Sequence, residues 1–258
     1  MRAHRPGIAL FWISLTLVLF SGCSYGRQDG TNATFRVMTY NIHHGEGIDS
    51  TVDLKRIAAV IQETGADIVA LQEVDRGVER TNKIDIMTEL SDLTGMAYAF
   101  GKNIDYKGGD YGNGFLSRFP ILEEKNHHYA MIRPGEQRGL LCLVLEVRGR
   151  EIVVMNTHID YRPDDAERLM NVDEIFPLVR TFSPRPVILC GDFNDTPESR
   201  TIAKLGGAFV DTWTLAGIGE SFTYPTAGPK KRIDYVFSSR ENDSAPALRA
   251  ISARVVRS

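Results

Sequence analysis

The chain alternates short apolar, β-branched runs with segments in which apolar residues recur every three or four positions. Runs of the first kind predict buried strands. Residues 53–64 show the second pattern and are followed by Gly65, which favours the end of a helix. The clearest runs cover residues 35–38, 68–71, 152–155 and 187–190.

Further elements follow from the same patterns. The predicted helices cover residues 84–94 and 164–180, and the predicted strands cover residues 98–101, 114–117, 140–147, 151–156, 233–237 and 250–256. Short continuous apolar runs suit sheets that are covered on both faces, so the pattern predicts an α/β fold of two packed sheets with helices outside. No repeat or linker interrupts it, which predicts one domain over residues 35–258.

Polar side chains follow four of the predicted strands. They are Asn41, Glu73, His158 and Asp192. Strands that each end in such a residue before a loop indicate one site assembled at one end of a sheet. Oxygen ligands together with a histidine suit a divalent cation and phosphate-ester chemistry.

Each of these residues has a predicted role. A carboxylate at the end of a buried strand is costly unless it is paired, so Glu73 is interpreted as a metal ligand, with a salt bridge to Arg76 as the alternative. Asp192 is expected to activate water, and Asn194 to donate to the developing phosphorane oxygens. His158 is expected to protonate a leaving oxygen or to bind the phosphate.

Five further polar residues complete the candidate site. Asn41 is expected to hold a phosphate oxygen or a catalytic carboxylate, unless it only stabilises its turn. Asp234 lies within an apolar strand and is expected to orient a histidine or arginine partner. Of the adjacent histidines 43 and 44, one should line the cleft, and we assign this role to His43. Arg138 is either a phosphate clamp or a solvated loop arginine, and Asn113 is a weaker substrate-binding candidate.

The N-terminus has the pattern of an export signal. Arg2 and Arg5 precede an uncharged apolar stretch over residues 8–20, which is short for a membrane span. Small residues then precede Cys23, and the whole resembles a bacterial lipoprotein signal. The resemblance implies a signal peptide at 1–22, a lipidated Cys23, a tether over 23–34 and anchoring in the outer membrane, facing the periplasm of a Gram-negative bacterium. A plain secretory signal or an uncleaved anchor is the alternative.

The charge of the chain bears on its binding partners, and its cysteines bear on its core. Removal of residues 1–22 takes away two arginines and no acid, which changes the formal net charge from −3 to −5. An acidic chain is a poor candidate for binding polyanions by bulk attraction. Cys142 and Cys190 lie in apolar runs and are predicted to be buried thiols, although an exported protein could form a disulfide.

Taken in order, these motifs resemble the endonuclease/exonuclease/phosphatase superfamily, whose fold is like that of deoxyribonuclease I. The resemblance implies a four-layer α/β/β/α sandwich and hydrolysis of a phosphoester with Mg²⁺ or Mn²⁺. It places Glu73 at the metal, Asn41, His158, Asp192 and Asn194 at phosphate- and water-activating positions, and Asp234 beside a second histidine. The matching segments are 38–41, 67–73, 113–120, 156–158, 191–194 and 232–235.

One departure from the family pattern concerns the C-terminus. The superfamily's Ser-Asp-His motif and its final strand would follow residue 258, so we expect either a truncated hydrolase or a remnant that binds ligand without efficient turnover. The function predicted is an exported, membrane-anchored metal-dependent phosphoesterase, with no protein partner inferred. A small or lipid-derived phosphoester is favoured over duplex DNA, and nucleic-acid scavenging stays open.

Overall fold

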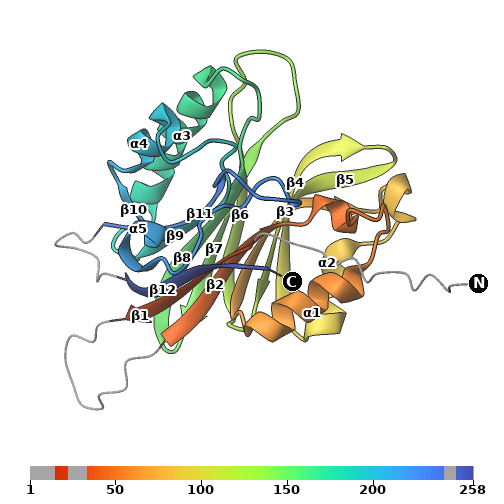
Figure 1. The fold of residues 1–258 in the computed structure, drawn as a ribbon, viewed down its shortest axis with the longest axis horizontal. Helices are drawn as coiled ribbons and strands as arrows, with labels where there is room; N and C mark the ends of the chain where they lie inside the picture. The colour runs from red at the N-terminus through yellow and green to blue at the C-terminus, as the bar shows by residue number, and fades with distance from the viewer. Residues whose placement is uncertain (1–14, 23–33, 241–247, 258) are drawn as a thin grey trace, which may run out of the picture.

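Two six-stranded sheets pack against each other in the computed structural model, which describes residues 15–22, 34–240 and 248–257 (Figure 1). The first sheet has the order β12-β1-β2-β3-β5-β4 and the second β10-β11-β9-β8-β7-β6. The strands of the first sheet are β1 (Leu15–Gly22), β2 (Thr34–Asn41), β3 (Ile68–Arg76), β4 (Ala97–Tyr106), β5 (Gly109–Ser117) and β12 (Leu248–Val256). Those of the second are β6 (Ile121–His128), β7 (Gly139–Val147), β8 (Arg150–His158), β9 (Val187–Asp192), β10 (Phe209–Asp211) and β11 (Asp234–Ser239).

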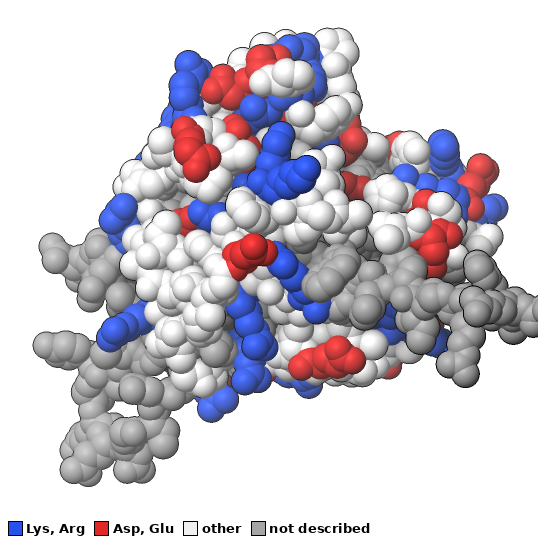
Figure 2. All heavy atoms as spheres, viewed as in Figure 1, with Lys and Arg blue, Asp and Glu red and all other residues white. Residues whose placement is uncertain are grey.

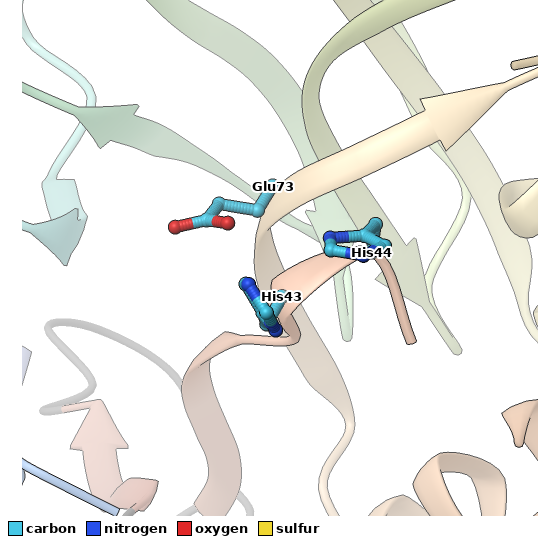
Figure 3. Close-up of side chains that lie close together, drawn as sticks. All are labelled: His43, His44 and Glu73. Atoms are coloured by element: carbon cyan, nitrogen blue, oxygen red, sulfur yellow. The ribbon is translucent and has the colours of Figure 1, made fainter. Parts of the chain in front are cut away.

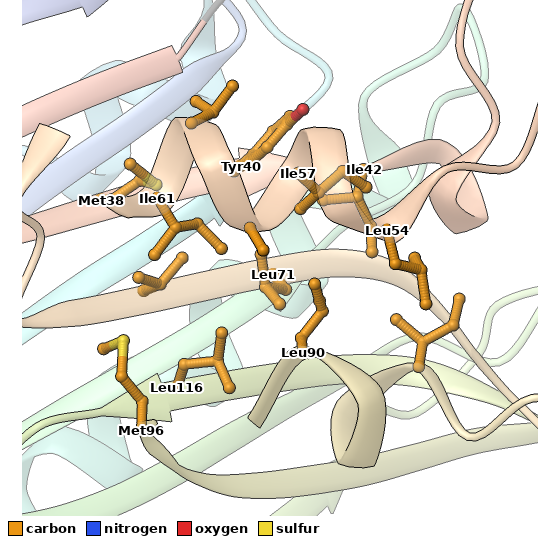
Figure 4. Close-up of a cluster of buried hydrophobic side chains, with 14 of the residues drawn as sticks. Met38, Tyr40, Ile42, Leu54, Ile57, Ile61, Leu71, Leu90, Met96 and Leu116 are labelled. Atoms are coloured by element: carbon orange, nitrogen blue, oxygen red, sulfur yellow. The ribbon is translucent and has the colours of Figure 1, made fainter. Parts of the chain in front are cut away.

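Helices cover the outer faces of both sheets, on opposite sides of the molecule (Figure 1). The helices are α1 (Leu54–Thr64), α2 (Ile86–Thr94), α3 (Ala166–Thr181), α4 (Arg200–Leu205) and α5 (Thr212–Ala216). Helices α1 and α2 pack on the first sheet through a cluster that includes Ile57 and Leu90 (Figure 4). Helices α3 and α4 pack on the second sheet through residues such as Val172 and Leu205. The predicted four-layer α/β/β/α sandwich is therefore confirmed.

The strands are apolar on both faces because both faces are buried. In β2, Val37 contributes to the cluster between the sheets, whereas its neighbour Met38 contributes to the cluster under α1. Successive side chains of a strand point to opposite faces, so a strand between two apolar layers needs an unbroken apolar run. Cys142 and Cys190 are buried free thiols in these layers, as expected, and burial raises the pKa of the Cys142 thiol to about 12.

Local signals fix the helix ends. The Asp53 carboxylate accepts hydrogen bonds from the backbone N–H groups of Lys55 and Arg56 and so caps the first turn of α1. The helix ends at Gly65, whose φ of 63° is the left-handed conformation that glycine adopts without strain. The helices predicted over 53–64, 84–94 and 164–180 are found as α1, α2 and α3.

Strand β6 and the short helix α4 were not predicted. Strand β6 lies at the edge of its sheet and pairs with β7 alone. Most of its side chains are exposed, and its sequence Ile-Leu-Glu-Glu-Lys-Asn-His-His shows neither alternation nor an apolar run. An edge strand with polar residues is protected from pairing with other chains, but it carries little sequence signal.

Strand β1 falls within the segment that was predicted to be a signal peptide. It pairs antiparallel with β12 on one side and with β2 on the other, so it lies inside the first sheet. Cys23 and the tether lie outside the described residues, and cleavage before Cys23 stays a prediction. Within the described ranges no helix is both long and apolar enough to cross a membrane.

Candidate active site

The strand register brings three predicted site residues into one row across the second sheet. His158 on β8 pairs with Asp192 on β9, and Asp192 pairs with Asp234 on β11. Adjacent strands lie about 4.8 Å apart, so the three side chains occupy one end of the sheet. The first sheet adds Asn41 from the end of β2 and Glu73 from β3.

Glu73 reaches the site through a bulge in β3. Leu71 pairs with Gly114 and Val74 with Gly112, so Gln72 and Glu73 together face the single residue Asn113. The extra residue reverses the usual alternation, and Glu73 has a φ of 59°, a left-handed conformation that is costly for a side chain with a Cβ. The bulge thus turns Gln72 into the interior and Glu73 toward the cleft.

A buried amide pair holds this bulge. The Asn156 side chain donates to the carbonyls of Leu71 and Gly114, both at 2.8 Å. The Gln72 side chain donates in turn to Asn156 Oδ1 at 2.6 Å and to Thr39 Oγ1 at 3.1 Å. Carbonyls near the bulge would otherwise be buried without partners, which costs about 1–3 kcal/mol each. Asn156 therefore positions Glu73 from the second sheet.

Asp192 is the most constrained carboxylate of the site. Its Oδ1 accepts from the backbone N–H of Asn194 at 2.9 Å, and its Oδ2 accepts from the Asn41 amide at 3.1 Å. The same Asn41 amide donates to Glu73 Oε1 at 2.8 Å, so one side chain links two carboxylates. Burial raises the pKa of Asp192 to about 6, whereas the bonds from Asn194 and Asn41 lower it and the Glu73 charge raises it.

His158 and Asp234 flank Asp192 and are both buried. Burial, with a contribution from the Arg138 charge, holds the pKa of His158 well below its usual value, so the imidazole is neutral. Its Nε2 lies 3.8 Å from Asp192 Oδ2, and its Nδ1 has no partner among the described residues. Burial and the Asp192 charge raise the pKa of Asp234 well above its usual value.

The expected histidine or arginine partner of Asp234 is not present in the described part of the chain. Instead the Thr223 hydroxyl contacts this residue, and Asp234 Oδ1 is buried without a hydrogen bond. The prediction rested on the rule that a buried carboxylate needs a basic partner. The raised pKa of Asp234 removes the need for a basic partner, because a protonated carboxyl carries no charge.

Arg138 lines a cleft of about 1140 Å³, which is lined as well by Asn41, Glu73, His158, Asp192 and Asp234. The residue is 6% exposed, so it is not a solvated loop arginine. The guanidinium lies 2.8 Å from Glu136 Oε1 and 5.8 Å from the centre of the Tyr161 ring. Arg138 lines the cleft, and a guanidinium in such a position suits an anionic oxygen.

The side chains of two other predicted residues donate to backbone carbonyls. Asn113 is buried, donates to the Gly139 carbonyl at 3.2 Å and does not line the cleft. The Asn194 amide donates to the Ile159 carbonyl at 3.0 Å, so its backbone, rather than its side chain, serves Asp192. Their substrate contacts stay predictions. Arg76, the alternative partner of Glu73, pairs with Asp110.

Known proteins resemble this chain in sequence. The model of the endonuclease/exonuclease/phosphatase family matches residues 38–249, which is most of the chain. The chain belongs to this family. It is 29% identical over 226 residues to the uncharacterized protein YbhP of Escherichia coli, with 83% of this chain and 88% of that protein covered.

Solved structures of other proteins share the fold. The mannosyl-6-phosphatase Bt3783 of Bacteroides thetaiotaomicron superposes with a TM-score of 0.65 at 19% identity, covering 80% of this chain and 85% of that one. A truncated TDP2 of Caenorhabditis elegans gives a TM-score of 0.61 at 21% identity, covering 80% and 84%. These two similarities establish the sandwich fold.

The acidic residues of this family member fit a divalent cation. Electrostatic repulsion links three carboxyl groups of the site. The negative charge of Glu73 raises the pKa of both Asp192 and Asp234. Asp234 also has a buried oxygen without a partner among the described residues. Converging carboxylates are stable when a cation offsets their charge, so the donor set suits a hard or borderline divalent ion.

Sequence reasoning missed the residues that form the rim of the cleft. Ile48, Tyr161 and Tyr224 line it and are 57%, 67% and 52% exposed. Arg162 and Lys231 line it as well. They lie in loops without periodicity, where no sequence pattern separates a rim residue from an ordinary surface residue.

Proposed function

We propose that the chain is a divalent-metal-dependent phosphoesterase in which Asp192 accepts the proton of the attacking water. The observation that carries the proposal is the state of this carboxylate. It is buried, two hydrogen bonds fix both of its oxygens, and its pKa of about 6 lies close to the pH at which a general base works best.

The neighbouring residues have complementary tasks. Asn41 and the Asn194 backbone hold the Asp192 oxygens, so the base does not have to reorient during the reaction. Arg138 binds a phosphate oxygen, and the neutral His158 imidazole donates to another. A divalent cation at Glu73 would offset negative charge on the phosphate.

For the substrate we propose a small or lipid-derived phosphoester. Arg138, Arg162 and Lys231 supply positive charge inside the cleft, whereas Tyr161 and Tyr224 add exposed aromatic surface at its rim. A phosphate with an attached apolar group fits this combination. On the face that Figure 2 shows, basic and acidic residues are interspersed.

The test is metal-dependent hydrolysis of p-nitrophenyl phosphate and bis-p-nitrophenyl phosphate by the full chain, with and without Mg²⁺ or Mn²⁺. Asp192→Asn keeps the size of the side chain and should lower kcat by about 10²- to 10⁴-fold. Asp49→Asn, an exposed position outside the row of site residues, is the matched control and should leave kcat unchanged. Equal rates in wild type and Asp192→Asn would refute the proposal. Substrate binding by wild type without turnover would favour the non-catalytic alternative.

For localisation we propose export as a lipoprotein with Cys23 as the modified residue. The support is the pattern of residues 1–23. Cleavage before Cys23 would remove β1, so mass spectrometry of the N-terminal peptide distinguishes the two forms. A lipidated peptide that begins at Cys23 supports the proposal, and recovery of intact residues 15–22 from the mature protein contradicts it.

A further inference from the structure

Two adjacent histidines follow β2 at the mouth of the cleft. His43 and His44 lie in a short 3₁₀ turn with φ values of 44° and 46°. Their ring centres are 4.4 Å apart, with the planes inclined by 59°. One donor atom of each histidine and one carboxylate oxygen of Glu73 all lie within 4.8 Å of one another (Figure 3).

The hydrogen bonds of the two rings define which nitrogens are free. His43 Nδ1 lies 3.4 Å from the Glu46 carbonyl, and His44 Nε2 lies 3.4 Å from Glu46 Oε2. Both partners are acceptors, so each ring places its N–H there and keeps a lone pair on the other nitrogen. This is the usual arrangement of a metal-binding histidine, whose second nitrogen donates to a carboxylate or a carbonyl.

His44 provides an independent sign of a missing partner. Its residue is 5% exposed, and its Nδ1 is buried with no hydrogen bond among the described residues. A buried nitrogen with an unused lone pair costs free energy unless something binds it. Figure 3 shows a ring nitrogen of each histidine on the side that faces Glu73.

Glu73 offers the third ligand without giving up its other contact. Asn41 donates to Oε1 at 2.8 Å, and the described contacts leave Oε2 without a hydrogen bond. Bonds of about 2.0–2.2 Å from a cation to imidazole and carboxylate need donor atoms within about 4 Å of one another. The present spacing of up to 4.8 Å is slightly wider, and the exposed His43 side chain is the ligand with the most room to move.

We propose that His43, His44 and Glu73 form a site for a borderline first-row cation, such as Mn²⁺, Co²⁺ or Zn²⁺, and that Glu46 positions both imidazoles. Two nitrogen ligands select such ions over Mg²⁺, which prefers oxygen ligands and keeps its waters. The inference rests on the proposed function through Glu73, which both share. It further specifies the metal preference of the hydrolase.

The test is Co²⁺ binding by the full chain after removal of metals with EDTA, followed by visible absorption. Imidazole ligation should give a d–d band, and titration calorimetry should show at least tenfold tighter binding of Co²⁺ or Zn²⁺ than of Mg²⁺. His43→Ala and His44→Asn should each lose the band and weaken Co²⁺ binding at least tenfold. Glu46→Gln should weaken it less, since it acts through the ligands.

The chain contains its own matched control. His127 and His128 are also adjacent, but His127 pairs with Glu174 at 2.9 Å and His128 with the Lys102 carbonyl at 2.7 Å. Alanine at both positions should leave the Co²⁺ spectrum unchanged. Since His43 is exposed, its variant should fold even if the His44 variant does not.

The outcomes separate this proposal from that of phosphoesterase activity. Asp192→Asn should lose turnover and keep the Co²⁺ band, which supports both proposals. A band that depends on the histidines in a protein without turnover supports the metal site and counts against the hydrolase. A spectrum that is unchanged in His43→Ala, or equal affinity for Mg²⁺ and Co²⁺, overturns the metal site whether or not the protein turns over substrate.

Discussion

Replacement of Asp192 by asparagine should change the pH dependence of stability. The difference in unfolding free energy between the variant and the wild type should shift in favour of the variant as the pH rises from 5 to 7.5. Burial raises the pKa of this carboxyl from 3.8 to about 6, so between these values the folded state binds more protons than the unfolded state. The free energy of unfolding of the wild type therefore falls as pH rises through this window. A rise in pKa from 3.8 to about 6 corresponds to a loss of about 3 kcal/mol in the free energy of unfolding, which is complete above pH 6.

Asparagine does not titrate, so the variant escapes this loss. The substitution also changes the free energy of unfolding in a way that does not depend on pH, for example through the altered contact with Asn41. This contribution cancels when two pH values are compared. Between pH 5 and pH 7.5 the unfolding free energy of the variant should rise against that of wild type by roughly half of the 3 kcal/mol. Urea unfolding in EDTA at both pH values measures this difference without a contribution from bound cations.

The control is Asp49→Asn. Its hydrogen bond from Arg56 lowers the pKa of the exposed Asp49 carboxyl, so any stability that it adds is lost only at more acidic pH. Its difference from wild type should stay flat from pH 5 to pH 7.5. If Asp192→Asn also gives a flat difference, Asp192 has an ordinary pKa in the folded protein and the argument for a poised general base fails.

Three further predictions concern other parts of the site. Arg138→Ala should raise KM about 10- to 100-fold through the loss of a charge-assisted bond to phosphate, and an unchanged KM in steady-state kinetics would contradict that role. Asn156→Ala should lower the free energy of unfolding by about 2–4 kcal/mol in urea titrations, because it leaves the carbonyls of Leu71 and Gly114 without a donor. Glu73→Gly should raise the melting temperature by relieving about 1 kcal/mol of left-handed strain while it removes metal binding in calorimetry, and a lower melting temperature would show that the bulge is not strained.

The strand-end residues were predictable because their position follows from the sheet itself. An apolar run that stops at Asn41, His158 or Asp192 marks the edge of a buried sheet, and parallel neighbours bring such edges together. The bulge at Glu73 could not be predicted in the same way. It depends on amide contacts from Asn156 on the other sheet, 84 residues from Gln72 in the sequence.

Other features lacked any local signal. The polar edge strand β6 has no periodicity, and the rim residue Tyr161 lies in a loop. The apolar run at 15–22 fits two interpretations, a buried strand and an export segment, because both need continuous apolar residues. Glu46 contacts both His43 and His44 because the chain turns back on itself there, and no sequence pattern predicts this turn.

The amide of Asn41 gives this protein a specific weakness to chemical ageing. Asparagine side chains in stored proteins hydrolyse slowly to aspartate, which exchanges an N–H donor for a negatively charged oxygen. At position 41 the change would place a third carboxylate against Glu73 and Asp192, where the amide now donates to both. An aged preparation would then keep its size and fold but carry an altered arrangement of carboxylates, visible as a small gain in acidity.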